Sequence, residues 1–222
     1  MKDIARFIAG FERFQAKYFH DERGLFSRLS RGQQPRALVI SCCDARVDPA
    51  MLTGADPGDL FVVRNVANLV PPYRDESEAP GVRSAIEFAV KTLEVEHIIV
   101  LGHTSCGGIA ALMAGEGITE HKYEFIGPWV SIAKRAREKV LRELPQKPPE
   151  LQARACEQAA ILVSLDNLLS FPWIRERIDS NALELHGWHF DIDSGDLLAY
   201  SAETATFEPL VSGTATEAGA NT

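Results

Sequence analysis

Three short apolar runs, rich in β-branched residues, alternate with segments of helical periodicity in the first half of the chain. The runs cover residues 36–42 (RALVISC), 59–65 (DLFVVRN) and 97–102 (HIIVLG). A continuous apolar run of this length is typical of a strand buried on both faces. Strands that alternate with helices pair in parallel through right-handed crossovers. The alternation therefore predicts an α/β fold, in which flanking helices cover a central, mostly parallel sheet of about four strands.

The remaining patterns extend this prediction to the whole chain. Helices are expected over 4–18, 24–32, 49–53, 82–95, 128–144, 150–170 and 172–179, and one more begins near residue 106. Asp48 is the expected N-cap of the third helix, and Gly54 its stop signal. The alternating segment 182–201 contains the turn DSGD and predicts a late hairpin with a C-terminal edge strand. We expect one domain over residues 1–205, with a helical arm over 1–32 and a flexible tail over 206–222.

Composition and charge narrow the class of partner. The chain has 222 residues, 45% of them hydrophobic, and a formal net charge of -8. This charge argues against nucleic acid and anionic membranes as partners. The first residues lack the apolar core of a signal peptide, and no uncharged apolar run approaches the roughly 18 residues of a membrane helix. We therefore expect a cytoplasmic protein, in which clustered cysteines are more often metal ligands or catalytic thiols than disulfides.

Two of the predicted strands end in residues that bind metals. The first runs into CCDAR (42–46) and the third into GHTSCGG (102–108). Because ligands bind at the carboxyl ends of parallel strands, we expect Cys42, His103 and Cys106 to converge there. Two thiolates and one imidazole form a zinc ligand set that leaves a fourth position open, as in catalytic zinc sites. The alternative is that the three residues are separate members of the core.

Asp44 and Arg46 supply a helper beside such a metal. Two thiolates offset the charge of zinc. The pKa of its bound water is therefore lowered less than at a zinc held by three neutral histidines. Asp44 lies two residues after Cys42 and therefore points to the same side of an extended chain. Arg46 is placed to hold Asp44 ionised and oriented. The alternative is a purely structural ion pair.

The two motifs resemble those of the β-class carbonic anhydrases. The similarity is carried by SCCDARV (41–47) and GHTSCGG (102–108), with LFVVRNVANLVPPY (60–73) between them. It runs from about Gln33 to Met113 and continues more loosely to the GWHFDI segment. The resemblance implies reversible hydration of CO2 to bicarbonate and a proton, by attack of zinc-bound hydroxide. It also implies a homodimer or higher homo-oligomer, in which the N-terminal helix wraps around the partner.

The resemblance also implies roles for individual residues. One Zn2+ per subunit would be held by Cys42, His103 and Cys106, and the catalytic dyad would be Asp44 and Arg46. The positions that match the family's substrate pocket are Gln33, Phe61, Val66, Phe88 and Gly107. Gly107 matches a backbone N–H donor, whereas Phe88 stands where the plant-like branch often has tyrosine. Some of this pocket would come from the neighbouring subunit.

One further position bears on regulation. A branch of the family that bicarbonate switches off carries tryptophan three residues before the first zinc cysteine, and this chain has Val39 there. Together with the VPPY segment (70–73), Val39 favours the constitutively open, plant-like branch. We therefore expect water, and not Asp44, as the fourth zinc ligand.

Other interpretations of the sequence stay open. The same site could act on COS or CS2, or the protein could be a zinc or thiol sensor in which Cys43 responds to oxidant. Asp44 and Arg46 favour the enzyme, because a sensor does not need them. We expect Cys43 and Cys156 to be small core residues. The histidines without ligand-like neighbours, among which no proton shuttle is identified, are His20, His97, His121, His186 and His189.

Overall fold

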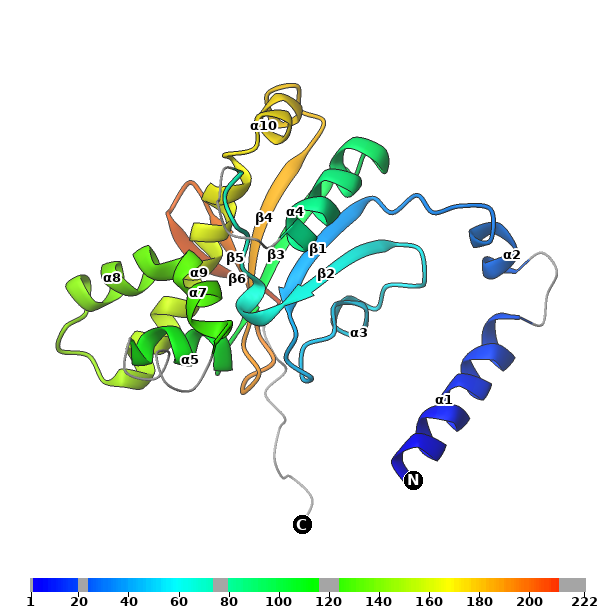
Figure 1. Ribbon diagram of the computed structural model, residues 1–222, viewed down its shortest axis with the longest axis horizontal. Helices are drawn as coiled ribbons and strands as arrows, with labels where there is room; N and C mark the ends of the chain where they lie inside the picture. The colour runs from blue at the N-terminus through cyan, green and yellow to red at the C-terminus, as the bar shows by residue number, and fades with distance from the viewer. Residues whose placement is uncertain (1, 20–23, 74–79, 116–123, 212–222) are drawn as a thin grey trace, which may run out of the picture.

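A computed structural model describes residues 2–19, 24–73, 80–115 and 124–211. Within them, one six-stranded sheet has the order β2-β1-β3-β4-β5-β6 (Figure 1). The strands are β1 (Ala37–Cys42), β2 (Leu60–Asn65), β3 (His97–His103), β4 (Glu184–Phe190), β5 (Leu197–Ser201) and β6 (Thr206–Val211). The first four pair in parallel, and β5 and β6 are antiparallel. The predicted α/β fold with a mostly parallel sheet is therefore confirmed.

The C-terminal part of the sheet is larger than the sequence indicates. The expected hairpin is present as β4 and β5. The prediction of a flexible tail from residue 206 is wrong for its first six residues, because Thr206–Val211 forms β6 and pairs with β5. This strand contains Pro209, which is tolerated at the edge of a sheet but weakens the sequence signal for a strand. The rest of the predicted tail, 212–222, lies outside the described residues.

The helices cover the sheet and build its core. They are α3 (Pro49–Thr53), α4 (Pro80–Glu87), α5 (Gly107–Ala114), α7 (Ile126–Val130), α8 (Lys134–Glu143), α9 (Pro149–Leu168) and α10 (Pro172–Asp179), with the short turns η1 (Val66–Asn68), η2 (Phe88–Thr92) and η3 (Ser131–Ala133). Leu38 and Ile40 of β1 pack with residues of α4, α9 and α10, whereas Val39 packs on the opposite face. This alternation follows from the two-residue period of a strand. No described helix has both the length and the apolar character that a bilayer crossing needs.

The short helix α3 follows its sequence signals. The side chain of Asp48 accepts a hydrogen bond from the Met51 N–H at 3.1 Å, and Gly54 ends the helix with a φ of 65°. The capping side chain satisfies an N–H group that has no partner within the helix. The expected N-cap and stop are both confirmed, and α3 closes the loop that leaves β1.

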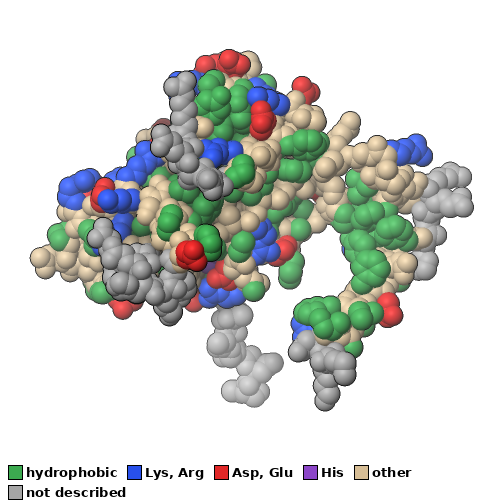
Figure 2. Space-filling view, viewed as in Figure 1, with side chains coloured by type: hydrophobic (Ala, Val, Ile, Leu, Met, Phe, Trp, Pro, Cys, Tyr) green, Lys and Arg blue, Asp and Glu red, His purple; other side chains and the backbone are tan. Residues whose placement is uncertain are grey.

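The N-terminal arm consists of α1 (Lys2–Tyr18) and α2 (Leu25–Leu29), and it extends away from the sheet (Figure 1). Phe14 of α1 contacts Phe26 of α2 through a ring pair at 5.4 Å. The apolar residues nearer the start of α1 are 58–62% exposed: Ile4, Phe7, Ile8 and Phe11. Figure 2 shows hydrophobic side chains gathered along this arm. In one chain, therefore, much of the predicted apolar stripe has no surface to cover.

Candidate metal centre

The three predicted ligands meet at the carboxyl edge of the sheet. Cys42 ends β1, His103 ends the neighbouring strand β3, and Cys106 is the N-cap of α5. Their ligand atoms all lie within 4.8 Å of one another, and the two sulfur atoms are 3.9 Å apart. All three side chains are buried. The fold thus brings Cys42 together with His103 and Cys106, which are 61 and 64 positions further along the chain, because adjacent parallel strands end at the same edge.

The donor set suits a zinc ion. His103 Nδ1 lies 2.8 Å from the Thr104 carbonyl and donates its proton there, so Nε2 carries the free lone pair. Among the residues that the structure describes, this buried Nε2 has no hydrogen-bond partner. The Cys106 thiol lowers the pKa of Cys42, and the hydrogen bond with Cys42 raises the pKa of Cys106. Two sulfur atoms this close hold one proton between them, whereas a dication would allow both to be thiolates.

Asp44 is fixed beside the ligands by Arg46. The Arg46 backbone N–H and Nε each donate to Asp44 Oδ1 at 2.9 Å, and Nη2 donates to Oδ2 at 2.7 Å. These bonds hold the pKa of Asp44 well below its ordinary value, so its carboxylate is ionised at physiological pH. Asp44 Oδ2 lies 4.0 Å from His103 Nε2. Arg46 Nη2 also donates to the Ser105 carbonyl at 3.1 Å, which links the two loops that carry the ligands.

Arg64 and Asn65, whose roles the sequence leaves open, brace these loops. Arg64 donates from Nε to the Cys42 carbonyl at 2.9 Å and from Nη2 to the Asp44 carbonyl at 2.7 Å. Asn65 bonds through its side chain to the backbone N–H and carbonyl of Leu69. Both residues lie at the end of β2, next to β1. They therefore shape the backbone around the ligands, and in these hydrogen bonds their side chains contact backbone groups and not the ligand atoms.

Two of the predicted pocket residues lie at this edge of the sheet. Val66 packs in the core cluster that contains Cys42 and Cys106, and its carbonyl accepts a hydrogen bond from Trp129 Nε1 at 2.7 Å. Gly107 is the first residue of α5, and a Cβ added there would meet no atom within 4 Å. The space beside Gly107 is thus open, as a substrate site next to an N–H donor requires.

The other three predicted pocket residues lie away from the ligands of the same chain. Phe61 in β2 is four residues before Asn65, the register partner of Cys42, which places it about 13 Å from the carboxyl edge. Its ring contacts that of Phe88 at 5.9 Å, and Phe88 is 43% exposed. Gln33 is exposed in the segment before β1. One chain alone therefore does not assemble the whole predicted pocket.

Two of the cysteine predictions have different outcomes. Cys43 is exposed, so the expectation of a core residue is wrong. The strand ends at Cys42, and the alternation of sides on which that expectation depended ends with it. Cys156 is fully buried in α9 as predicted, and burial raises the pKa of its thiol to about 12. Cys43 instead lines a surface cavity with Asn65, Val66 and Trp129.

Comparisons with known proteins match this geometry. A sequence model of the carbonic anhydrase family matches residues 37–197, a range that includes all three predicted ligands and the Asp44–Arg46 pair. The chain is also 39% identical over 193 residues to beta carbonic anhydrase 3 of Arabidopsis thaliana, covering 86% of this chain and 74% of that protein. The chain belongs to the β-carbonic anhydrase family. The family and its named members are enzymes, and this chain is accordingly an enzyme of the carbonic anhydrase type.

Solved β-carbonic anhydrase structures share the fold. The β-carbonic anhydrase CcaA matches with a TM-score of 0.88 and 36% identity, over 94% of this chain and 92% of that one. One of two tetrameric β-carbonic anhydrases from Sordaria macrospora matches with a TM-score of 0.74 and 28% identity, over 96% of this chain and 98% of that one. The sheet, the flanking helices and the N-terminal helices are thus those of the β-carbonic anhydrases.

Glu157 and His189 form a buried pair behind the ligands of this β-carbonic anhydrase, and the sequence did not predict it. Glu157 of α9 is 5% exposed, and its Oε1 accepts a hydrogen bond from the Cys106 backbone N–H at 3.1 Å. Its Oε2 lies 3.5 Å from Nε2 of His189, which is fully buried. The expectation that His189 has no ligand-like neighbour is therefore wrong. The one sequence signal was a glutamate among the apolar residues of α9, since buried acidic groups require partners.

Replacing Glu157 with alanine is expected to lower the free energy of unfolding by about 2–3 kcal/mol, because the buried Cys106 N–H loses its acceptor. Zinc affinity should fall by about 10–100-fold, as is typical when a group that orients a ligand is lost. Glu157→Gln keeps an oxygen for this N–H and should retain most of both quantities. Urea unfolding and zinc competition with a chelator measure them. Equal losses in the two variants would contradict this role of the Cys106 hydrogen bond.

The two glycines that begin α5 are expected to differ in their tolerance of a side chain. A Cβ at Gly108 would lie 2.6 Å from Val66 Cγ1 and 2.9 Å from Ala67 Cβ, whereas a Cβ at Gly107 meets open space. Gly108→Ala should therefore cost about 1–3 kcal/mol of stability through overpacking. Gly107→Ala is the matched control and should change the stability by less than about 0.5 kcal/mol. Thermal unfolding of both variants compares them, and equal midpoints would contradict the close packing.

Proposed function

We propose that this protein catalyses the reversible hydration of CO2 to bicarbonate and a proton, with one zinc ion held by Cys42, His103 and Cys106. The observation that carries the proposal is the convergence of two buried sulfur atoms and the unpartnered Nε2 of His103 beside the ionised Asp44. Two thiolates and one imidazole suit zinc and leave one coordination position open. Membership of the β-carbonic anhydrase family supports the same reaction.

Different residues of the chain would bind the metal, orient the attacking oxygen and bind CO2. A zinc ion held by Cys42, His103 and Cys106 would supply the activation of water near neutral pH. Asp44 can only accept hydrogen bonds, so it fixes the orientation of the attacking oxygen, and Arg46 holds Asp44 ionised and in place. The N–H of Gly107, free at the start of α5, donates to an oxygen of CO2. Val66 gives the pocket an apolar side, which suits a nonpolar substrate.

We also propose that water, and not Asp44, completes the zinc coordination. Three hydrogen bonds from Arg46 hold Asp44 in place beside the ligands, and Oδ2, which accepts only one of them, keeps a lone pair that can accept a hydrogen bond from water. Val39 stands where the bicarbonate-sensitive branch has tryptophan. This residue supports membership of the constitutively open branch, in which water is the fourth ligand. The coordination number and the ligand types can be read from zinc X-ray absorption at pH 7 and pH 9.

A homo-oligomer is part of the proposal. The exposed apolar residues of α1 need a surface to cover, and Gln33, Phe61 and Phe88 lie away from the ligands of their own chain. A second copy would satisfy both requirements by covering α1 and by bringing these pocket residues to the neighbouring centre. The tetrameric relatives from Sordaria macrospora support this arrangement. Sedimentation velocity tests it, and a protein that stays monomeric at micromolar concentration would contradict it.

The direct test of the function is stopped-flow CO2 hydration by protein whose zinc content has been measured. We expect about one zinc per chain and hydration activity that a chelator removes and zinc restores. A panel with COS and CS2 distinguishes the related substrates. Full metal occupancy without hydration activity would reject the proposed function.

A further inference from the structure

A second group of metal-binding side chains lies at the opposite edge of the sheet. His97 begins β3 and Glu184 begins β4, and the two are register partners. His186 is two residues further along β4 and therefore lies on the same face as Glu184. The expectation that His97 and His186 have no ligand-like neighbours is wrong: the partners of His97 lie 87 and 89 positions further along the chain, and Glu184 lies only two positions before His186. The cluster of Cys42, His103 and Cys106 is at the carboxyl edge, so the two groups are distinct.

The three donor atoms form a compact triangle. His97 Nδ1 lies 3.2 Å from His186 Nε2, and Glu184 Oε2 lies 3.5 and 3.7 Å from these two nitrogens. A point equidistant from the three atoms is about 2.0 Å from each, which is the length of a zinc bond to histidine or carboxylate. A proton shared between the two rings would satisfy the histidines alone. It would not require one carboxylate oxygen close to both nitrogens.

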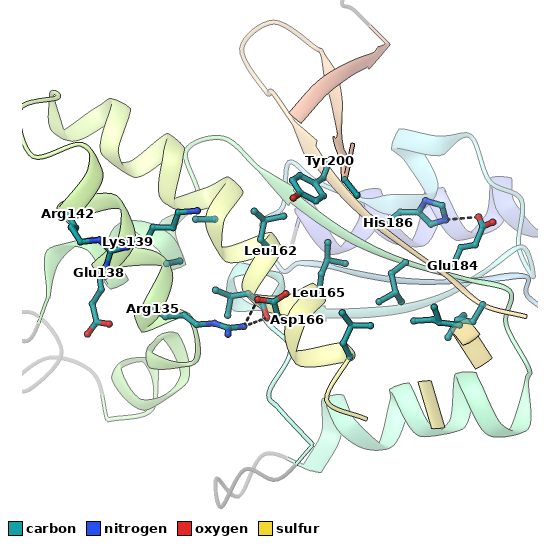
Figure 3. A pocket seen from close by; sticks show the side chains of 18 of the residues that line it. Arg135, Glu138, Lys139, Arg142, Leu162, Leu165, Asp166, Glu184, His186 and Tyr200 are labelled. Atoms are coloured by element: carbon teal, nitrogen blue, oxygen red, sulfur yellow. Dashed lines mark hydrogen bonds and ion pairs between the residues drawn. The ribbon is translucent and has the colours of Figure 1, made fainter. Parts of the chain in front are cut away.

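The group is also accessible. The side chains of His97, Glu184 and His186 are 40%, 68% and 33% exposed, so an ion can enter and keep water on its outer side. Glu184 and His186 line a surface cavity together with Tyr200 and Leu165 (Figure 3). In Figure 3 the His186 ring and the Glu184 carboxylate point toward each other. This cavity lies away from the ligand cluster at the carboxyl edge and lacks all its residues.

We propose that His97, Glu184 and His186 bind a divalent transition-metal ion, with Zn2+ as the expected occupant. Imidazole ligands favour Zn2+, Ni2+ or Cu2+, whereas Mg2+ and Ca2+ prefer oxygen ligands. The ion ties the amino ends of β3 and β4 together. Because the triangle exists only in the folded chain, binding stabilises the native state by mass action.

The test adds Zn2+ to the protein that already carries its first equivalent, at pH 8, where histidine is ordinarily neutral. Equilibrium dialysis should show a second equivalent per chain, which millimolar Mg2+ does not displace. In His97→Gln/His186→Gln, binding of this equivalent should be weaker by at least about 10-fold, since even the loss of an outer-shell partner costs that much. The matched control is Glu96→Gln, beside His97 but outside the triangle, and it should bind normally. No second equivalent, or one that survives in the double variant, overturns the proposal.

A second readout does not depend on a variant. Cu2+ added to the zinc-loaded wild-type protein should give an electron paramagnetic resonance spectrum with coupling to two imidazole nitrogens. A spectrum without nitrogen coupling overturns the proposal. Cys106→Ser, which removes a ligand of the first centre, should leave the second equivalent in place. This variant therefore separates a failure of the proposed function from a failure of this inference.

Discussion

Replacing Cys106 with serine is expected to reduce kcat/KM for CO2 hydration by on the order of 1,000-fold, because the site loses its metal and with it the means of activating water. A serine hydroxyl is close in size to the thiol but does not ionise to a ligand near neutral pH. The remaining donors, Cys42 and His103, would hold zinc much more weakly. Zinc content by mass spectrometry and hydration by stopped flow measure the two losses.

The matched control for this variant is Cys43→Ser. Cys43 is exposed next to Cys42, and its sulfur is not part of the ligand cluster. It should therefore keep its zinc and its activity. Full activity in Cys106→Ser would contradict the metal centre, and loss of zinc in Cys43→Ser would show that the ligand set is misassigned.

Asp44→Asn should lower kcat/KM by about 100-fold or more while the zinc content stays the same. The asparagine side chain is close to isosteric with aspartate, but its amide cannot accept at both positions, so the orientation of the attacking oxygen is lost. Because Arg46 keeps the pKa of Asp44 far below its ordinary value, Asp44 does not titrate near neutral pH. The pH dependence of the wild-type rate should therefore reflect the activated water and not this carboxylate.

Asp48→Asn is the control for the charge change in the same loop. Asp48 caps α3 and lies 3.3 Å from Arg64, and it is not among the residues of the ligand cluster. Asparagine is an equally good N-cap, so the stability and the rate should both stay near the wild-type values. If Asp44→Asn were as active as Asp48→Asn, the orienting role of Asp44 would be wrong.

The sequence was most informative where local rules apply. The strands that end in Cys42 and His103, and the cap of α3 at Asp48, follow from apolar runs and cap residues a few positions long. Because the carboxyl ends of parallel strands lie at the same edge of a sheet, the predicted strands already imply that the ligands meet. The β-carbonic anhydrase motifs then indicated the candidate roles of Asp44 and Gly107.

Contacts between distant segments could not be predicted in the same way. Glu157 supports Cys106 from 51 positions away, and His97 meets His186 from 89 positions away. Neither pairing has a periodic signature in the chain. The exposure of Cys43 depended on where β1 ends, and element boundaries are poorly determined by local patterns. The strand β6 was missed because Pro209 and polar residues hide a pairing that its neighbour β5 stabilises.

The distance between Phe61 and the ligands of its own chain has a consequence for working conditions. If each pocket is completed by residues from a second copy, subunit association and catalysis are linked by mass action. We then expect the specific activity to fall on dilution below the dissociation constant of the assembly, even though every chain keeps its zinc. Recovery of the rate on reconcentration would identify separated subunits, and not denaturation, as the cause.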